Sequence, residues 1–186
     1  MSAGALHLRL RAATASAHAA LEEELGWEAR VATLDGYRGL LARLHGFHAA
    51  WEPAIGAALG DGAFFDSRRR VGALDRDLGF LGLSAQDIAG LPRARPIALG
   101  GAAEAMGALY VLEGSTLGGR VIGRHIMATH GLAGDGLAYY SGHAAGTGAM
   151  WSAFRTRLEA FDGDGDAVVA AANATFDAMR MWLKAP

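Results

Sequence analysis

The stretch of sequence that decides the fold is residues 102–129, AAEAMGALYVLEGSTLGGRVIGRHIMAT. Its apolar side chains recur at steps of three and four, the period that places them along one α-helix; they are Met106, Leu109, Tyr110, Leu112, Leu117, Val121, Ile122 and Ile126. The same stretch also contains five glycines, Gly107, Gly114, Gly118, Gly119 and Gly123. Each interior glycine destabilises a helix by roughly 1 kcal/mol relative to alanine. Five glycines, which leave the backbone without side chains, therefore require an explanation.

Two explanations of the glycines remain open at the level of sequence. In the first, small residues four positions apart allow tight packing against another helix, with Gly114 paired to Gly118 and Gly119 to Gly123. In the second, a planar ligand lies against the bare backbone, and the helix bends or unwinds there. Ser115 and Thr116 would then offer hydroxyl groups to that ligand. Composition does not choose between them.

The rest of the chain also follows the helical period. We expect helices over residues 8–25, 34–59, 71–81, 85–89, 150–161 and 167–183, with a stop at Gly26, a kink or break at Pro53 and an N-cap at Ser84. Residues 91–96 and the glycine-rich residues 131–148 are expected to be connections. No series of β-branched runs alternates at a period of two. The sequence therefore predicts an all-α, single-domain helical bundle covering residues 1–186.

Composition excludes several classes of function. The 186 residues are 52% hydrophobic with a net charge of −2, which gives no general attraction to nucleic acid or to an anionic membrane surface. The chain has 0 cysteines, so it has no disulfide, thiolate metal site or cysteine nucleophile. The first residues lack the apolar core of a secretory signal, and no stretch is apolar enough to span a bilayer. We expect a cytoplasmic protein with no membrane or nucleic-acid partner.

His18 lies in an unusual setting on the first predicted helix. At about 100° per residue it shares a face with Leu21 and Glu22, and Arg11 returns to that face about 10 Å away. One interpretation is a half-buried histidine paired with Glu22. The other is an axial ligand for the metal of a flat apolar cofactor, with Arg11 placed for an acidic group on its rim.

Other charged clusters receive structural interpretations. The acidic residues at 162, 164 and 166 lack the glycine and glutamate that a calcium loop requires, so we interpret them as a turn. No Glu-x-x-His motif of a di-iron bundle is present. His45 and His48 are expected at the edge of the core, and the Arg68, Arg69, Arg70 run is expected on a solvated face.

These motifs together resemble those of the bacterial haem oxygenases. The resemblance rests on LRAAT at 10–14 leading to His18 and Leu21-Glu22, on YVLEGSTLGG at 110–119, and on WSAFR at 151–155 with Phe176. It spans nearly the whole chain. It implies an all-α fold with haem held between a proximal helix, which carries the iron ligand, and a kinked, glycine-rich distal helix.

The resemblance also assigns residues. His18 matches the proximal iron ligand, and Glu22 matches its partner one turn on. Gly114 and Gly118 match the distal glycines that cross the oxygen-binding face. Ser115 stands where mammalian-type members have an aspartate. The remaining implied haem contacts are Arg11 and Arg155 at the propionates, with Thr116, Gly119 and Phe176 around the ring.

The implied reaction is oxidative cleavage of haem, which is both cofactor and substrate, to biliverdin, carbon monoxide and ferrous iron. Electrons would come from an external reductase or a ferredoxin-type donor, because no nucleotide-binding motif for a flavin or nicotinamide is present. The product could supply a bacterial phytochrome with its chromophore. One alternative is a non-catalytic haem carrier or sensor on the same fold. A thiamin-hydrolysing enzyme is a weaker alternative, since those members rely on a cysteine.

Overall fold

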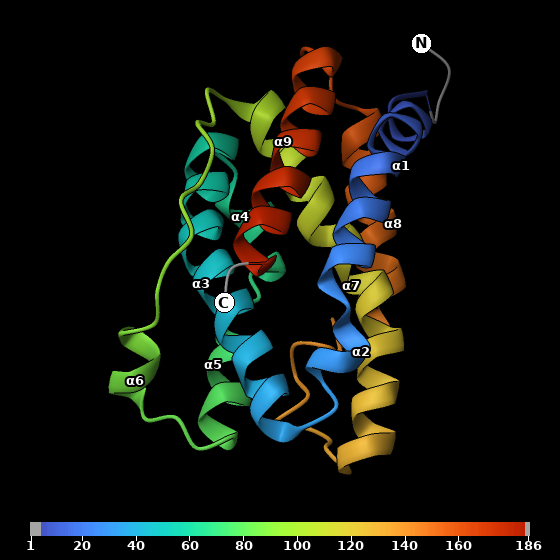
Figure 1. Ribbon diagram of the computed structural model, residues 1–186. Coiled ribbons are helices and arrows are strands. Elements are labelled where there is room, and N and C mark those ends of the chain that lie inside the picture. Colours follow the sequence, from blue (N-terminus) through green and yellow to red (C-terminus); the bar gives the residue numbers. More distant parts are fainter. Residues whose placement is uncertain (1–4, 185–186) are drawn as a thin grey trace.

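The computed structural model describes residues 5–184, and within that range every regular element is a helix (Figure 1). The elements in chain order are α1 (Ala5–Leu25), α2 (Trp27–Arg30), α3 (Leu34–Leu59), α4 (Gly62–Phe65), η1 (Asp66–Arg68), α5 (Val71–Phe80), α6 (Ala85–Ala89), α7 (Ala102–His130), η2 (Ala144–Gly146), α8 (Thr147–Glu159) and α9 (Gly165–Lys184). The predicted all-α bundle is confirmed.

The predicted helices begin and end within three residues of the observed ones. Gly26 takes a left-handed φ of 51° directly after α1, as a helix stop requires. Ser84 and Asp87 form a reciprocal capping box at the start of α6. Of the kink or break expected at Pro53, a break does not occur, because α3 continues through this residue to Leu59. The short helices α2 and α4 escaped prediction, since four residues carry no readable period.

Helix α7 is the centre of the bundle. It packs against α9, α3 and α8, while α1 packs against α9 and α8. Figure 1 shows α7 changing direction part-way along its length, and its lower end extends below α1 and α8. The core beneath it holds fully buried aromatic side chains, among them Tyr37, Phe47, Trp51, Phe65 and Phe154.

One glycine of α7 is explained by helix packing. A Cβ atom at Gly107 would lie 2.2 Å from the carbonyl oxygen of Val168 and 2.9 Å from the Cβ of Ala171. The two backbones of α7 and α9 therefore approach too closely for any side chain at this position.

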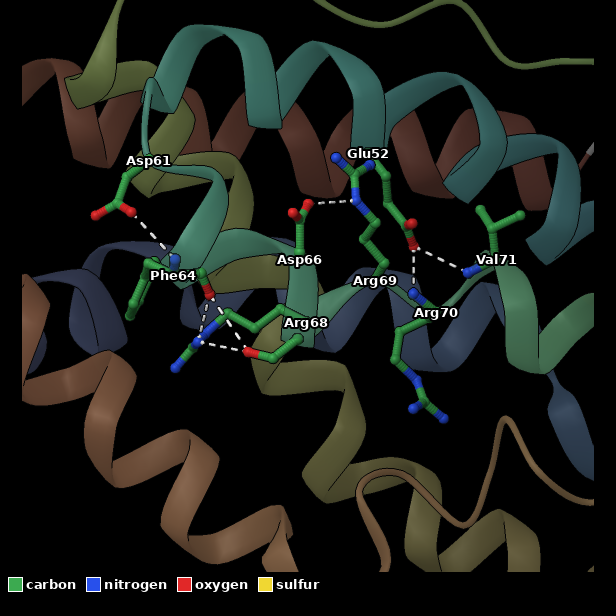
Figure 2. Close-up of polar contacts among 9 residues, drawn as sticks. Glu52, Asp61, Phe64, Asp66, Arg68, Arg69, Arg70 and Val71 are labelled. Atoms are coloured by element: carbon green, nitrogen blue, oxygen red, sulfur yellow. Dashed lines mark hydrogen bonds and ion pairs between the residues drawn. The ribbon is translucent and has the colours of Figure 1, made fainter.

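The arginine run at 68–70 does not form a solvated face, so that prediction is wrong for two of its three members. Arg68 and Arg70 are each only 7% exposed. Arg68 pairs with buried Glu113 of α7, with Nε and Oε1 3.4 Å apart. Arg69 remains outside and bonds Asp66 at 2.9 Å. Figure 2 shows the Arg69 side chain pointing to the opposite side from those of Arg68 and Arg70.

The expected edge positions of His45 and His48 are also wrong. His45 is 2% exposed and His48 is 0% exposed, so both lie inside the core. His45 Nε2 lies 3.0 Å from the carboxylate of Asp75, and His48 bonds Glu52 at 2.9 Å. Each carboxylate pairs with one ring nitrogen, Nε2 of His45 and Nδ1 of His48, and this lowers the cost of burying the two rings.

The connection after α7 is tied to α5 by a buried carboxylate. Asp77 is fully buried and accepts hydrogen bonds from the backbone N–H groups of Gly136, Ala138 and Tyr139, at 2.7 to 2.9 Å. Burial raises the pKa of Asp77, and the three backbone donors oppose that rise. The segment 136–139 is thereby fixed against the core without regular secondary structure.

Gly107→Ala should destabilise the protein, because the added methyl group forces α7 and α9 apart. Overpacking of this kind typically costs about 1–3 kcal/mol. Gly39→Ala in α3 is the matched control: no atom lies within 4 Å of its added Cβ. That control should gain about 0.5–1 kcal/mol from helix propensity. Urea unfolding of both variants measures whether the free energy of unfolding falls or rises. Equal stability of Gly107→Ala and the wild type would contradict the packing explanation.

Candidate functional site

A cavity of about 520 Å³ lies between α1, α7, α8 and α9. Its size falls in the range of small-molecule sites, which is about 300–1,000 Å³. Helix α1 contributes one stripe of residues at steps of three and four: His7, Arg11, Thr14, Ala15, His18 and Leu21. The opposite wall comes from α7, with Tyr110, Val111, Gly114, Ser115 and Leu117, and the ends come from Trp151, Phe176 and Met179.

His18 enters the cavity from α1. Its side chain is 54% exposed, so the ring is accessible to a ligand. Nδ1 lies 3.5 Å from the carboxylate of Glu22, which does not line the cavity. The edge of the imidazole meets Phe176, with ring centroids 5.6 Å apart and planes at 87°. An imidazole held by a carboxylate on one nitrogen is the usual arrangement of a metal-binding histidine.

The glycines of α7 divide into two sets. A Cβ at Gly114 or Gly118 would meet no atom within 4 Å, so no protein packing requires these glycines. A Cβ at Gly119 or Gly123 would lie 3.2 to 3.3 Å from Tyr140. Packing therefore explains Gly119 and Gly123, whereas the bare backbone at Gly114 faces the cavity.

Not every predicted contact lies in the cavity. Ser115 lines it, and its hydroxyl donates to the carbonyl of Leu112 at 2.7 Å. Thr116 and Gly119 do not line it, because successive residues turn about 100° around the helix. The Thr116 hydroxyl donates to the backbone carbonyl of Glu113 instead, at 2.7 Å. Gly118 does not line it either; it follows Gly114 by four residues, about one helical turn.

Positive charge gathers at the end of the cavity nearest the start of α1. Burial lowers the pKa of His7, and the charges of Arg155 and Arg11 lower it further. Both arginines therefore lie near His7, although Arg155 does not itself line the cavity. The ring of His7 contacts Trp151, with centroids 5.7 Å apart, and its backbone N–H donates to Glu159 at 2.9 Å.

His7 escaped the sequence analysis. It stands four residues before Arg11, so it continues the α1 stripe toward the chain start. The spacing of His7 and Arg11 is visible in the sequence, but nothing in the sequence indicates that this face of α1 lines a cavity.

The cavity therefore offers three different surfaces to a ligand. One wall carries an accessible imidazole, the opposite wall carries bare helix backbone, and one end carries cations. The remaining lining is largely apolar and aromatic. A flat apolar molecule that has a metal at its centre and acidic groups on one edge matches this arrangement.

The comparison with known families agrees with this geometry. A family model described as heme oxygenase matches residues 5–185. The chain belongs to the haem oxygenase family. Haem oxygenases bind haem as their substrate, and the residues around this cavity fit such a molecule. A search of curated proteins found no match.

Two further observations concern residues 5–184. No helix in that range is both long and apolar enough to cross a bilayer. Nowhere in the same range do three or more His, Asp or Glu side chains gather as a metal-binding cluster.

Gly114→Ala and Gly118→Ala should raise the stability of the haem-free protein by about 0.5–1 kcal/mol each, because alanine favours a helix and nothing obstructs the methyl group. Gly123→Ala should lower it, since its methyl group meets Tyr140 at 3.2 Å. Melting temperatures of the three haem-free variants test which glycines are required by protein packing and which are not. A marked loss of stability in Gly114→Ala would show that protein packing, rather than ligand space, requires that glycine.

Proposed function

We propose that this protein binds haem in the cavity and cleaves it with oxygen and external electrons to biliverdin, carbon monoxide and ferrous iron. The observation that carries the proposal is that His18 of α1 and the unpacked glycine Gly114 of α7 line the same cavity. The family match supports haem oxygenase chemistry in general.

Haem binding is assigned to α1 and to the basic end. His18 is the iron ligand. The carboxylate of Glu22 lies 3.5 Å from Nδ1 of its ring. Arg11 and Arg155 bind the propionates, each contributing about 1–3 kcal/mol as a charge-assisted hydrogen bond where water is partly excluded. Phe176 contacts His18 and limits how far its ring can turn.

The reactive face is assigned to α7. Bound haem supplies the iron at which oxygen is activated. Gly114 and Gly118 allow the helix backbone to approach that face closely, and this approach favours attack at one edge of the ring. Ser115 is the hydroxyl that the cavity wall offers as a hydrogen-bond partner there. No ionisable side chain of α7 lines the cavity within the described chain except Tyr110.

The partners follow from the reaction. Electrons must reach the haem from a separate reductase or ferredoxin-type donor. A bacterial phytochrome is a proposed recipient of the tetrapyrrole. A haem carrier would need His18 but no oxygen chemistry, so turnover separates carrier from enzyme.

Haemin added to the wild-type protein should give a Soret band, and reductant in air should replace that band with biliverdin absorption. His18→Ala should lose the histidine-ligated spectrum and most of the turnover, and added imidazole should restore part of it. A stable Soret band under reductant and oxygen would indicate a carrier. Undiminished turnover by His18→Ala with an unchanged spectrum would contradict the ligand assignment.

Arg11→Ala should weaken haem binding by roughly 5- to 150-fold, the equivalent of about 1–3 kcal/mol, or mix the product isomers by letting the ring rotate. Arg9→Ala is the matched control, because Arg9 lies two residues away on α1 and pairs with Asp166 outside the cavity. Haem dissociation rates and product isomer ratios measure the effect. Equal values for Arg11→Ala and Arg9→Ala would remove Arg11 from the binding site.

A further inference from the structure

A second cavity, of about 560 Å³, lies between the short helix α6 and the helices α3 and α5. Its volume falls in the range of small-molecule sites, which is about 300–1,000 Å³. The lining comes from these three helices and from the chain on either side of α6, and none of its residues lines the haem cavity. The two cavities are therefore separate sites, and what the second one binds does not depend on the proposed function.

Helix α6 turns its apolar face to this second cavity. Ala85, Ile88 and Ala89 stand at steps of three and four along the helix, and all three line the cavity. Figure 1 shows α6 at the edge of the molecule, away from α7 and α9. Val71 and Leu83 add to the apolar lining. An apolar ligand would remove these side chains from water, which is favourable.

One wall of the second cavity carries a buried histidine. His45 of α3 is 2% exposed, and its Nε2 lies 3.0 Å from the carboxylate of Asp75, which also lines the cavity. Burial lowers the pKa of His45, so the ring is neutral near neutral pH and donates from Nε2 to Asp75. Nδ1 of the same ring is buried and has no hydrogen-bond partner within residues 5–184. The protein by itself therefore does not satisfy every polar group of this wall.

Arg93 supplies a cation to the second cavity. The chain returns from α6 to α3 beside this residue, where the backbone N–H of Ala94 donates to the carbonyl of Gly46 at 3.0 Å. Arg93 thus stands close to His45, and its positive charge contributes to the lowered pKa of that histidine. Arg93 is exposed, and its side chain forms no hydrogen bond or ion pair with the described residues 5–184. Its guanidinium is available to an acidic group of a ligand.

The two charged side chains of the cavity differ in what they already bind. Asp75 accepts from His45, whereas Arg93 is unpaired within the described chain. An amine would bring a second cation next to Arg93, and a phosphate or a dicarboxylate would bring further negative charge near Asp75. The lining therefore favours an apolar molecule with a single negative charge.

We propose that the second cavity binds a small apolar monocarboxylate, such as a medium-chain fatty acid. Arg93 binds the carboxylate through charge-assisted hydrogen bonds, and the apolar body lies against Val71, Leu83 and Ile88. Asp75 repels the acid group and so keeps it at the Arg93 end of the cavity. Binding is reversible, and no covalent bond changes.

Octanoate is the probe, and isoleucine methyl resonances of the haem-free protein report where it binds. Ile88 lines the second cavity, whereas Ile126 of α7 lies in the core, is 0% exposed and lines neither cavity. Millimolar octanoate should shift the Ile88 methyl resonance in a saturable way and leave that of Ile126 in place. An Ile88 resonance that does not move would overturn the proposal.

Octylamine and octanol test the charge of the ligand, because they share the apolar body of octanoate and lack its carboxylate. Both should bind roughly tenfold more weakly than octanoate, the equivalent of one charge-assisted hydrogen bond. Equal or tighter binding of either compound would show that the cavity does not recognise a carboxylate, and the proposal would be wrong.

Arg93→Ala should weaken octanoate binding by the same factor, roughly tenfold, because it removes the group that pairs with the carboxylate. Arg95→Ala is the matched control, since Arg95 stands two residues further along the same exposed connection and does not line the cavity. Titrations followed at the Ile88 methyl group give both dissociation constants. Equal constants for the two variants would overturn the assignment of Arg93.

Gly79→Leu tests the place of the ligand. Gly79 of α5 lines the cavity, and a Cβ atom there would meet no atom within 4 Å, so a leucine side chain has room to occupy the ligand space. Octanoate should then no longer shift Ile88. Gly72→Leu is the matched control, because Gly72 lies on the same helix outside the cavity lining. Wild-type binding by Gly79→Leu would overturn the proposal.

Melting temperatures show whether both leucine variants fold. If Gly79→Leu does not fold, the Arg93 and Arg95 variants, which change exposed side chains of a connection, decide the proposal. A protein that neither binds nor cleaves haem would refute the proposed function, whereas the octanoate titrations use the haem-free protein and would keep their meaning.

Discussion

Helix α7 carries glycine on two faces, and the surroundings of the two faces differ. At Gly107 the backbone of α9 fills the space that a side chain would need, and at Gly123 Tyr140 does so. At Gly114 no protein atom lies near. The glycines lower the helix propensity of this 29-residue helix, but they have two uses. Gly107 and Gly123 allow close packing, and Gly114 leaves bare backbone at the cavity. Helix α7 also packs against α8 and α9, which carry other residues of the cavity lining.

Buried charges support α7 from the side away from the cavity. Arg68 reaches Glu113, and Arg70 holds the connection at 138–139 together with Asp77. Desolvation makes such groups costly, and apolar side chains of similar volume would often be as stable. Hydrogen bonds are directional, so these groups fix positions that apolar contacts would not. The Asp77 carboxylate, which accepts from three backbone N–H groups, holds an irregular segment in one place.

Different chemical groups lie at different places in the cavity. The accessible imidazole of His18 stands on α1, and the bare stretch of α7 faces it. The cations Arg11 and Arg155 gather near His7, about 10 Å along α1 from His18 in the case of Arg11. A ligand with a central metal and acidic groups on one edge can satisfy both ends only in one general orientation.

The sequence by itself determined the α-helices longer than four residues and the face of α1 that carries His18 and Arg11, because a period of three to four residues is a local property of the chain. It also indicated His18, Arg11, Gly114 and Ser115 through motif spacing. Only the tertiary structure decided which glycines face protein and which face the cavity, since this depends on α9 and Tyr140. It also turned Arg68 and Arg70 inward and brought Tyr139 to the buried ring of His48. Those contacts join residues far apart in the chain, and partners at such separations leave no periodic trace in the sequence.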